Sequence, residues 1–126
     1  MKLEMEFHGS EISEIKVGKN EIEICFSHVV IITTPASGCK PKTEGVSAMI
    51  RIGSPKYKKL PKEGKLDDGE LYGIPGKALN GRIPVDFSSA RDCELELSLD
   101  HIDYTITGKS FMIHVDMASL PDELRH

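Results

Sequence analysis

Apolar and polar residues alternate along most of this chain, which is the pattern of β-strands that bury one face and expose the other. Glycine, proline and asparagine separate the alternating segments. No stretch of ten or more residues shows the periodicity of a helix. Strands are expected near residues 3–7, 15–17, 22–34, 46–52, 66–71 and 82–87, and again through the last third of the chain.

These segments predict an all-β domain of about eight or nine antiparallel strands. The 126 residues are enough to bury a core as one domain covering residues 1–126. Strands joined by successive hairpins either close into a small meander barrel or pack as a two-sheet sandwich, and the sequence is compatible with both. The run from Val29 to Ile32 is apolar on both faces, which predicts a central strand or one that crosses between sheets. Pro84 favours an edge position for its strand.

The first hairpin has apolar residues that match across its two strands if the turn is placed at Lys19-Asn20. The pairs are Val17 with Ile22 and Ile15 with Ile24. Ile12 and Ile15 would lie on opposite faces of a regular strand, so we expect a bulge near Ser13-Glu14.

The segment from Asp92 to Asp116 predicts three antiparallel strands with one shared apolar face. Asp100-His101 suits a two-residue turn, because aspartate and histidine enter positive φ more readily than most residues. This turn pairs Leu99 with Ile102, Leu97 with Tyr104 and Leu95 with Ile106. A second turn at Gly108-Lys109 would extend the same face by pairing Ile106 with Phe111, Tyr104 with Ile113 and Ile102 with Val115.

The same register predicts a polar row in which Asp103 lies between Ser98 and His114. These are the side chains of a hydrolytic triad, but a triad needs the imidazole between the hydroxyl and the carboxylate. The row therefore predicts no catalytic residue. Two His-x-Asp pairs, His101 with Asp103 and His114 with Asp116, could each supply two metal ligands. Neither spacing supplies a third ligand, so no metal and no cofactor is predicted.

The composition, with 39% apolar and 29% charged residues, is typical of a soluble globular protein. The N-terminal residues alternate charged with apolar side chains, unlike a signal peptide, and no apolar run could span a membrane. A cytoplasmic location is the resulting expectation. Cys25, Cys39 and Cys93 are an odd number at long spacings, which predicts free thiols rather than a disulfide framework or a zinc site.

Positive charge is concentrated between Lys40 and Lys65. This region holds eight basic and two acidic residues, a net charge of +6, so the remaining residues carry −10 of the total of −4. Residues 54–65 are expected to form a long exposed loop or a charged strand edge, where lysines also prevent unwanted strand pairing. The predicted binding residues are Lys56, Tyr57, Lys58, Lys59 and Lys62.

Lysines beside an aromatic residue could follow a phosphate backbone while the ring stacks on a base. The acidic chain, the lack of a second aromatic residue and the lack of arginine in this segment disfavour nucleic acid. The leading hypothesis is a non-enzymatic binding or assembly module that binds an acidic protein partner or a second copy of itself. The rival is a small metal-assisted hydrolase or isomerase using His114, Asp103 and Asp116. A third hypothesis is a structural subunit whose exposed strand edge pairs with a copy of itself.

Overall fold

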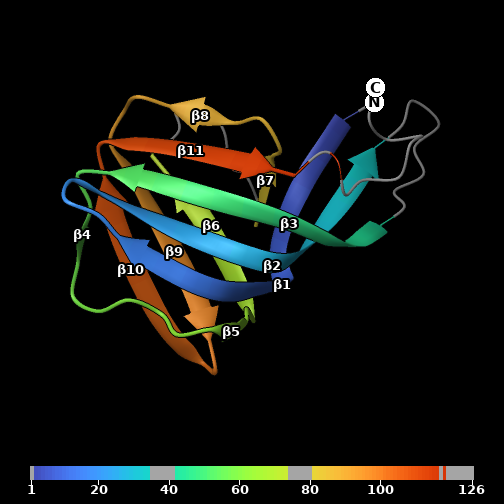
Figure 1. Cartoon of the computed structure of the whole chain (residues 1–126), viewed down its shortest axis with the longest axis horizontal. Coiled ribbons are helices and arrows are strands. Elements are labelled where there is room, and N and C mark those ends of the chain that lie inside the picture. Colours follow the sequence, from blue (N-terminus) through green and yellow to red (C-terminus); the bar gives the residue numbers. More distant parts are fainter. Residues whose placement is uncertain (1, 35–41, 74–80, 117, 119–126) are drawn as a thin grey trace.

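The computed structural model describes residues 2–34, 42–73, 81–116 and 118, and these residues form two antiparallel sheets. The strands of the smaller sheet cross those of the larger one at a steep angle (Figure 1). The strands are β1 (Lys2–Val17), β2 (Glu21–Thr34), β3 (Lys42–Gly53), β4 (Lys56–Tyr57), β5 (Gly64–Lys65), β6 (Asp68–Tyr72), β7 (Arg82–Pro84), β8 (Ser88–Ser89), β9 (Cys93–Leu99), β10 (Ile102–Gly108) and β11 (Ser110–Val115).

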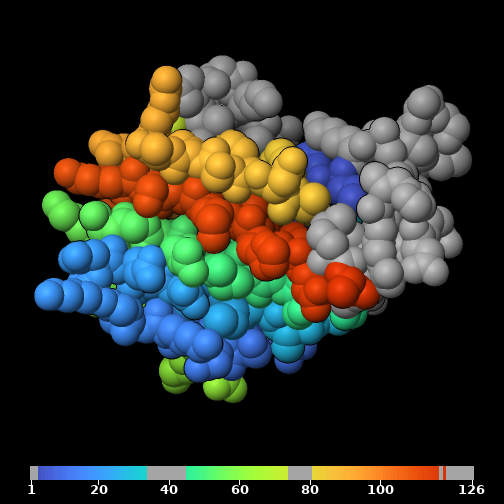
Figure 2. Space-filling model, turned by 45° about the horizontal axis from the view of Figure 1, so that its top comes forward, coloured from blue at the N-terminus to red at the C-terminus, as the bar shows by residue number. Residues whose placement is uncertain are grey.

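The larger sheet has the order β5-β1-β2-β3-β11-β8, and β7 also pairs with β1. Its strands lie as successive bands across the molecule in Figure 2. The smaller sheet has the order β4-β10-β9-β6. Each sheet keeps its own edge strands, so the predicted all-β class is confirmed as a two-sheet arrangement and the closed barrel is wrong. No helix in the described part of the chain is long and apolar enough to cross a membrane.

The eleven strands in the described residues exceed the predicted number because short edge strands give little sequence signal. β4, β5 and β8 are each two residues long. β7, which contains Pro84, lies at the edge of the larger sheet as expected. β6 begins at Asp68, two residues after the start of the strand predicted at residues 66–71.

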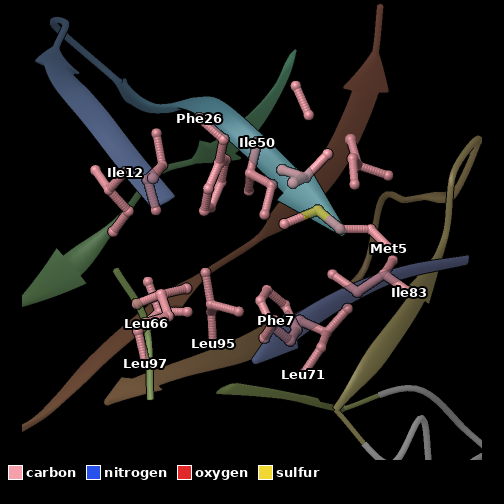
Figure 3. Close-up of a cluster of buried hydrophobic side chains, with 14 of the residues drawn as sticks. Met5, Phe7, Ile12, Phe26, Ile50, Leu66, Leu71, Ile83, Leu95 and Leu97 are labelled. Atoms are coloured by element: carbon pink, nitrogen blue, oxygen red, sulfur yellow. The ribbon is translucent and has the colours of Figure 1, made fainter. Parts of the chain in front are cut away.

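The core fills the space between the two sheets. Phe26 and Ile50 of the larger sheet point toward the side of the core formed by Leu95 and Leu97 of the smaller one, and Phe7 lies on that side, next to Leu71 (Figure 3). Each of these side chains is 2% exposed or less. Burying one such side chain contributes roughly 1.5–3 kcal/mol, so the contact between the sheets is the main source of stability.

β1 is one long strand, whereas the sequence predicted separate strands near residues 3–7 and 15–17. Its register with β2 shifts between Glu6 and Glu11, and Gly9 has a φ of 86°. The fully buried Ser10 donates its hydroxyl to the carbonyl of Glu6 at 2.6 Å and accepts a bond from the Val30 N–H at 3.2 Å. One hydroxyl therefore satisfies backbone groups that the irregular register leaves unpaired.

Two predicted hairpins are confirmed in register. In the first, Val17 lies opposite Ile22 and Ile15 opposite Ile24. The register also shifts between Ile12 and Glu14, where a bulge was expected. In the second, the pairs are Leu99 with Ile102, Leu97 with Tyr104 and Leu95 with Ile106. Asp100 and His101 both have positive φ, 53° and 64°, as their two-residue turn requires.

The third predicted hairpin is wrong, because β10 and β11 belong to different sheets. Phe111 of β11 lies opposite Ile52 of β3, and Ile113 lies opposite Ile50. Gly108 is the point at which the chain leaves the smaller sheet. A Cβ atom at this position would lie 2.3 Å from Ile52 Cγ2 and 2.9 Å from the Gly53 carbonyl oxygen. The glycine is thus needed for close packing, not for a tight turn.

We expect Gly108→Ala to lower the free energy of unfolding by about 1–3 kcal/mol, the usual cost of forcing extra atoms into a packed core. The added methyl group can be accommodated only if β3 shifts. Urea denaturation followed by circular dichroism measures the change. Lys109→Ala removes an exposed side chain next in the chain and is the control, with an expected change within about 0.5 kcal/mol. Equal stability of the two variants would contradict the close contact at Gly108.

Candidate functional site: a basic groove beside β10

The lysine-rich segment forms one edge of the smaller sheet. In β4, Lys56 lies opposite Thr107 of β10 and Tyr57 lies opposite Ile106. The Thr107 hydroxyl donates to the Lys56 carbonyl at 3.4 Å. The side chains of residues 56–59 are exposed. The sequence left a long exposed loop and a charged strand edge as alternatives; residues 56–57 form a strand edge, and residues 58–63 lie outside any strand.

A groove opens where the chain leaves β10 after Tyr57. Residues 56–59 and residues 103–105 of β10 line it, and we call this site the basic groove. Its volume is about 570 Å³, within the range of roughly 300–1,000 Å³ that is common for ligand sites. Beyond the groove the chain crosses in front of β10 near the β9–β10 turn and continues toward β5 (Figure 1).

Charge in the basic groove is predominantly positive. Three of the residues that line it are lysines, Lys56, Lys58 and Lys59, and Asp103 is the acidic residue of the described lining. Lys59 Nζ lies 5.3 Å from the centroid of the Tyr104 ring, a distance suited to a cation–π interaction. The Ser98 hydroxyl donates to Asp103 at 2.5 Å on the outer face of the sheet. The groove therefore presents a net positive charge with a largely buried aromatic ring behind it.

Four of the five predicted binding residues line the basic groove. Lys62 is exposed but does not contribute to the lining. The β10 side of the groove, residues 103–105, was not predicted to lie beside the lysines, and Asp103 was considered only as a residue of the metal-assisted alternative. No local sequence signal links β10 to β4, because the two strands are more than forty residues apart. The alternation of lysine with Tyr57 was the available sign that this segment could be a strand.

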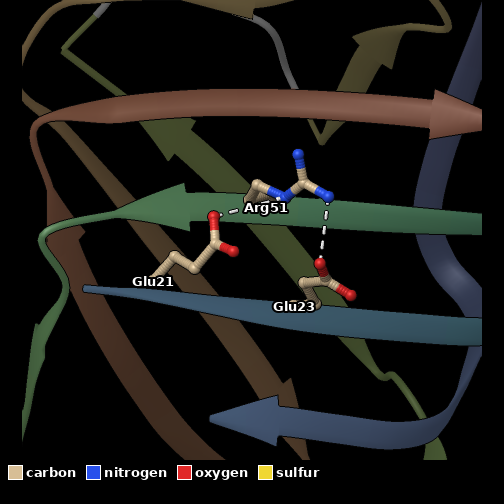
Figure 4. A network of polar contacts seen from close by, with 3 residues as sticks. All are labelled: Glu21, Glu23 and Arg51. Atoms are coloured by element: carbon tan, nitrogen blue, oxygen red, sulfur yellow. Dashed lines mark hydrogen bonds and ion pairs between the residues drawn. The ribbon is translucent and has the colours of Figure 1, made fainter. Parts of the chain in front are cut away.

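Arg51, the arginine of the basic region, lies outside the groove. It projects from β3, where its Nη2 is 3.0 Å from Glu23 Oε1 and its Nε is 3.4 Å from Glu21 Oε2 (Figure 4). Both carboxylates come from the neighbouring strand β2. These contacts offset the charge of Arg51, so the local positive field comes from the lysines of residues 56–59.

The rest of the outer face of the smaller sheet is acidic. Glu70 of β6 lies directly opposite Glu96 of β9, and Tyr72 lies opposite Glu94. The Glu70 carboxylate accepts a bond from the Gly81 N–H at 2.8 Å, which helps to hold it beside Glu96. Desolvation against the sheet raises the pKa of Tyr72, and the nearby carboxylates, Glu96 first, raise this pKa further. Positive and negative charge are thus separated across one sheet.

The predicted row of Ser98, Asp103 and His114 does not form. Ser98 and Asp103 are opposite each other, but His114 lies in the other sheet, opposite Met49 of β3. His114 and Asp103 were to act together with Asp116 in the metal-assisted alternative, and this register separates them. Across residues 2–34, 42–73, 81–116 and 118, no three His, Cys, Asp or Glu side chains are grouped in a way that could hold a metal ion.

Two other histidines, His101 and His8, both contact Asp67. The His101 N–H donates to Asp67 Oδ2 at 2.9 Å. His8 Nδ1 lies 2.6 Å from the Asp67 carbonyl oxygen, and this contact joins β1 to the segment before β6. Asp67 therefore connects the turn after β9 with the larger sheet, and its contacts with the two histidines hold the fold together.

Cys93 lines a second hollow, of about 380 Å³, on the other side of Lys56. Burial raises the pKa of its thiol, and the charge of Asp92 raises this pKa further, while a backbone hydrogen bond at Gly108 acts in the opposite direction. A raised pKa keeps the thiol protonated at neutral pH, and the thiolate is the nucleophile. Cys93 is therefore poorly suited to catalysis. Cys25 and Cys93 are both free thiols, and Cys39 lies outside the described residues.

Comparisons with protein-family models, curated proteins and solved structures give no match to this chain. The geometry of the basic groove and the charge of the strands around it are therefore the features that bear on function.

We expect Tyr72 to ionise above the ordinary tyrosine pKa of about 10, and we expect Glu96→Gln to lower its pKa. The substitution removes a negative charge that opposes formation of the phenolate. The difference in phenolate absorbance between the wild type and Tyr72→Phe isolates this titration. Added salt should lower the pKa in the same direction, because it screens exposed charges.

Glu14→Gln is the control, because this exposed residue lies on β1 of the larger sheet. A Tyr72 pKa that responds equally to Glu14→Gln and to Glu96→Gln would show that the acidic face has no local effect.

Proposed function

We propose that this chain is a non-enzymatic binding module whose basic groove binds an acidic segment of a partner protein. The observation that carries the proposal is the convergence of Lys56, Lys58 and Lys59 on one groove with a single carboxylate, Asp103. Opposite charges across an interface increase the rate of encounter and fix the register of the partner.

The acidic face of the smaller sheet supports a directional approach. Glu70, Glu94 and Glu96 repel an acidic partner from the face, while the lysines attract it to the edge. Exposed charges act over a Debye length of about 8–10 Å at physiological salt, which is about two strand spacings. An acidic segment is therefore guided to the groove at the edge of β10.

Protein is favoured over nucleic acid because the described lining of the groove offers a single well-exposed aromatic ring for stacking. Tyr57 is the partly exposed aromatic residue of the groove, at 38% exposure, and Tyr104 is only 6% exposed. Binding of single strands commonly uses several exposed rings on which successive bases stack. Among the residues that the structure describes, the groove lining also contains no arginine, the most common base-reading residue.

We expect the combined substitution of Lys56, Lys58 and Lys59 by glutamate to weaken partner binding by about tenfold or more. Each exposed ion pair contributes about 0.2–1 kcal/mol, and charge reversal replaces attraction by repulsion. Affinity capture from a lysate, followed by mass spectrometry and by titration of the purified acidic partner, measures the effect. Lys62→Glu should cause a smaller loss, because Lys62 does not line the groove.

The matched control replaces Lys16, Lys19 and Lys109 by glutamate. These lysines are also exposed, so the two triple variants have the same net charge. The control variant should retain its partners. If both variants lose the same partners equally, net charge and not the basic groove determines binding, and the proposed function is wrong.

A further inference from the structure

The edge of β10 is only partly covered. β4 pairs with Ile106 and Thr107, and in the described structure no strand follows the edge of β10 from Ile102 to Thr105. The basic groove lies beside this uncovered part, because residues 103–105 are among its lining. An uncovered edge presents backbone donors and acceptors that another chain can pair with.

The hairpin register determines which backbone groups point into the groove. Residues that flank a two-residue turn exchange backbone hydrogen bonds, and every second pair does so after them. Leu99 and Ile102 flank the turn, so Tyr104 is bonded to β9. The N–H and C=O groups of Asp103 and Thr105 therefore point away from β9.

A second hydrogen bond supports the same assignment of bonded and non-bonded pairs in the β9–β10 hairpin. The Ser98 carbonyl accepts the N–H of Asp67 at 2.8 Å, on the β6 side of β9. Ser98 thus does not bond across the hairpin to Asp103, which lies opposite it. Thr107 is the next residue of β10 whose backbone groups point away from β9, and Lys56 of β4 lies opposite it. A strand in the groove would continue the line of β4 along β10.

The groove has room for a short stretch of strand. A strand residue advances roughly 3.3 Å, lies about 4.8 Å from its neighbour and occupies a layer about 10 Å thick. By these dimensions three residues need roughly 480 Å³, compared with about 570 Å³ in the groove.

We propose that the basic groove binds its ligand by strand addition: an extended acidic segment of a partner protein pairs with the backbone of Asp103 and Thr105. This inference rests on the proposed function, and it names the binding mode. Backbone pairing supplies the register, and the lysines of residues 56–59 select an acidic sequence by charge complementarity. Asp103 has its carboxylate engaged by the Ser98 hydroxyl on the outer face.

The first test uses synthetic peptides and the intact protein. The probe is an acetylated, amidated heptapeptide of alternating glutamate and valine, titrated by isothermal calorimetry. Two further peptides carry N-methyl groups either on the valines or on the glutamates. Only one set of amides can face β10 at a time, because neighbouring backbone groups of a strand point to opposite sides. We expect one methylated peptide to bind at least tenfold more weakly than the other.

The second test compares Thr105→Pro with Thr105→Ala. Proline removes the N–H that points into the groove and is tolerated on an edge strand where that group has no partner. Alanine keeps the N–H and removes only the hydroxyl. We expect Thr105→Pro to weaken binding of the unmodified peptide by about tenfold or more, the effect of one lost backbone bond together with its neighbours. Thr105→Ala should bind like the wild type, and circular dichroism verifies that both variants are folded.

Equal binding of the two methylated peptides would overturn strand addition and leave an acidic partner held by charge alone. Absence of binding by the unmodified peptide at up to about 1 mM would overturn the present inference, whereas the proposed function is judged by its own lysine variants. A dimer of the wild-type protein that Thr105→Pro abolishes would identify a second copy of the chain as the occupant, which also contradicts the inference. The methylated peptides decide the question even if Thr105→Pro fails to fold.

Discussion

The corner at which the chain passes between the two sheets determines where the candidate site lies. Gly108 packs so closely against β3 that a side chain would collide with Ile52. The Lys109 N–H donates to the Gly53 carbonyl at 2.9 Å, which connects the crossing after β10 with the crossing after β3. Ser54, with a φ of 49°, then turns the chain out of the larger sheet. This turn delivers β4 to the edge of β10, so the basic groove depends on the corner.

The registers of single hairpins could be predicted from the sequence, because the position of the turn residues and the alternation of apolar residues must agree on one pairing. In the hairpin of β9 and β10, Asp100 and His101 accept positive φ, and a slip of one residue would expose every apolar side chain. The prediction failed for β11 because alternation shows only which residues face the core. Phe111 faces the core as predicted, but its neighbour in the sheet is Ile52, far earlier in the chain. Two strands across a core have the same alternating pattern as two strands side by side.

Only half of the candidate site could be predicted, because the sequence does not show which distant strands are neighbours. The lysines of residues 56–59 form a visible cluster in the sequence, whereas Asp103 and Thr105 are unremarkable residues of a distant strand. Their backbone groups are available for pairing because the β9–β10 register points them away from β9 and because β4 ends before it reaches them. Pro61, which is buried, lacks the N–H that a strand residue would donate, and it follows β4 by four positions. A chain without such an interruption could have covered the edge itself.

An uncovered edge is normally a hazard, because any extended chain can pair with it. The lysines of residues 56–59 make pairing at this edge depend on the charge of the incoming strand. An apolar or basic strand entering the groove would desolvate their ammonium groups without neutralising them, and this cost opposes pairing. An acidic strand neutralises the same charges as it pairs, so the lysines favour it over other chains. The acidic face formed by Glu70, Glu94 and Glu96 further restricts approach to the edge. Protection against indiscriminate pairing and selection of an acidic partner are therefore two effects of one charge distribution.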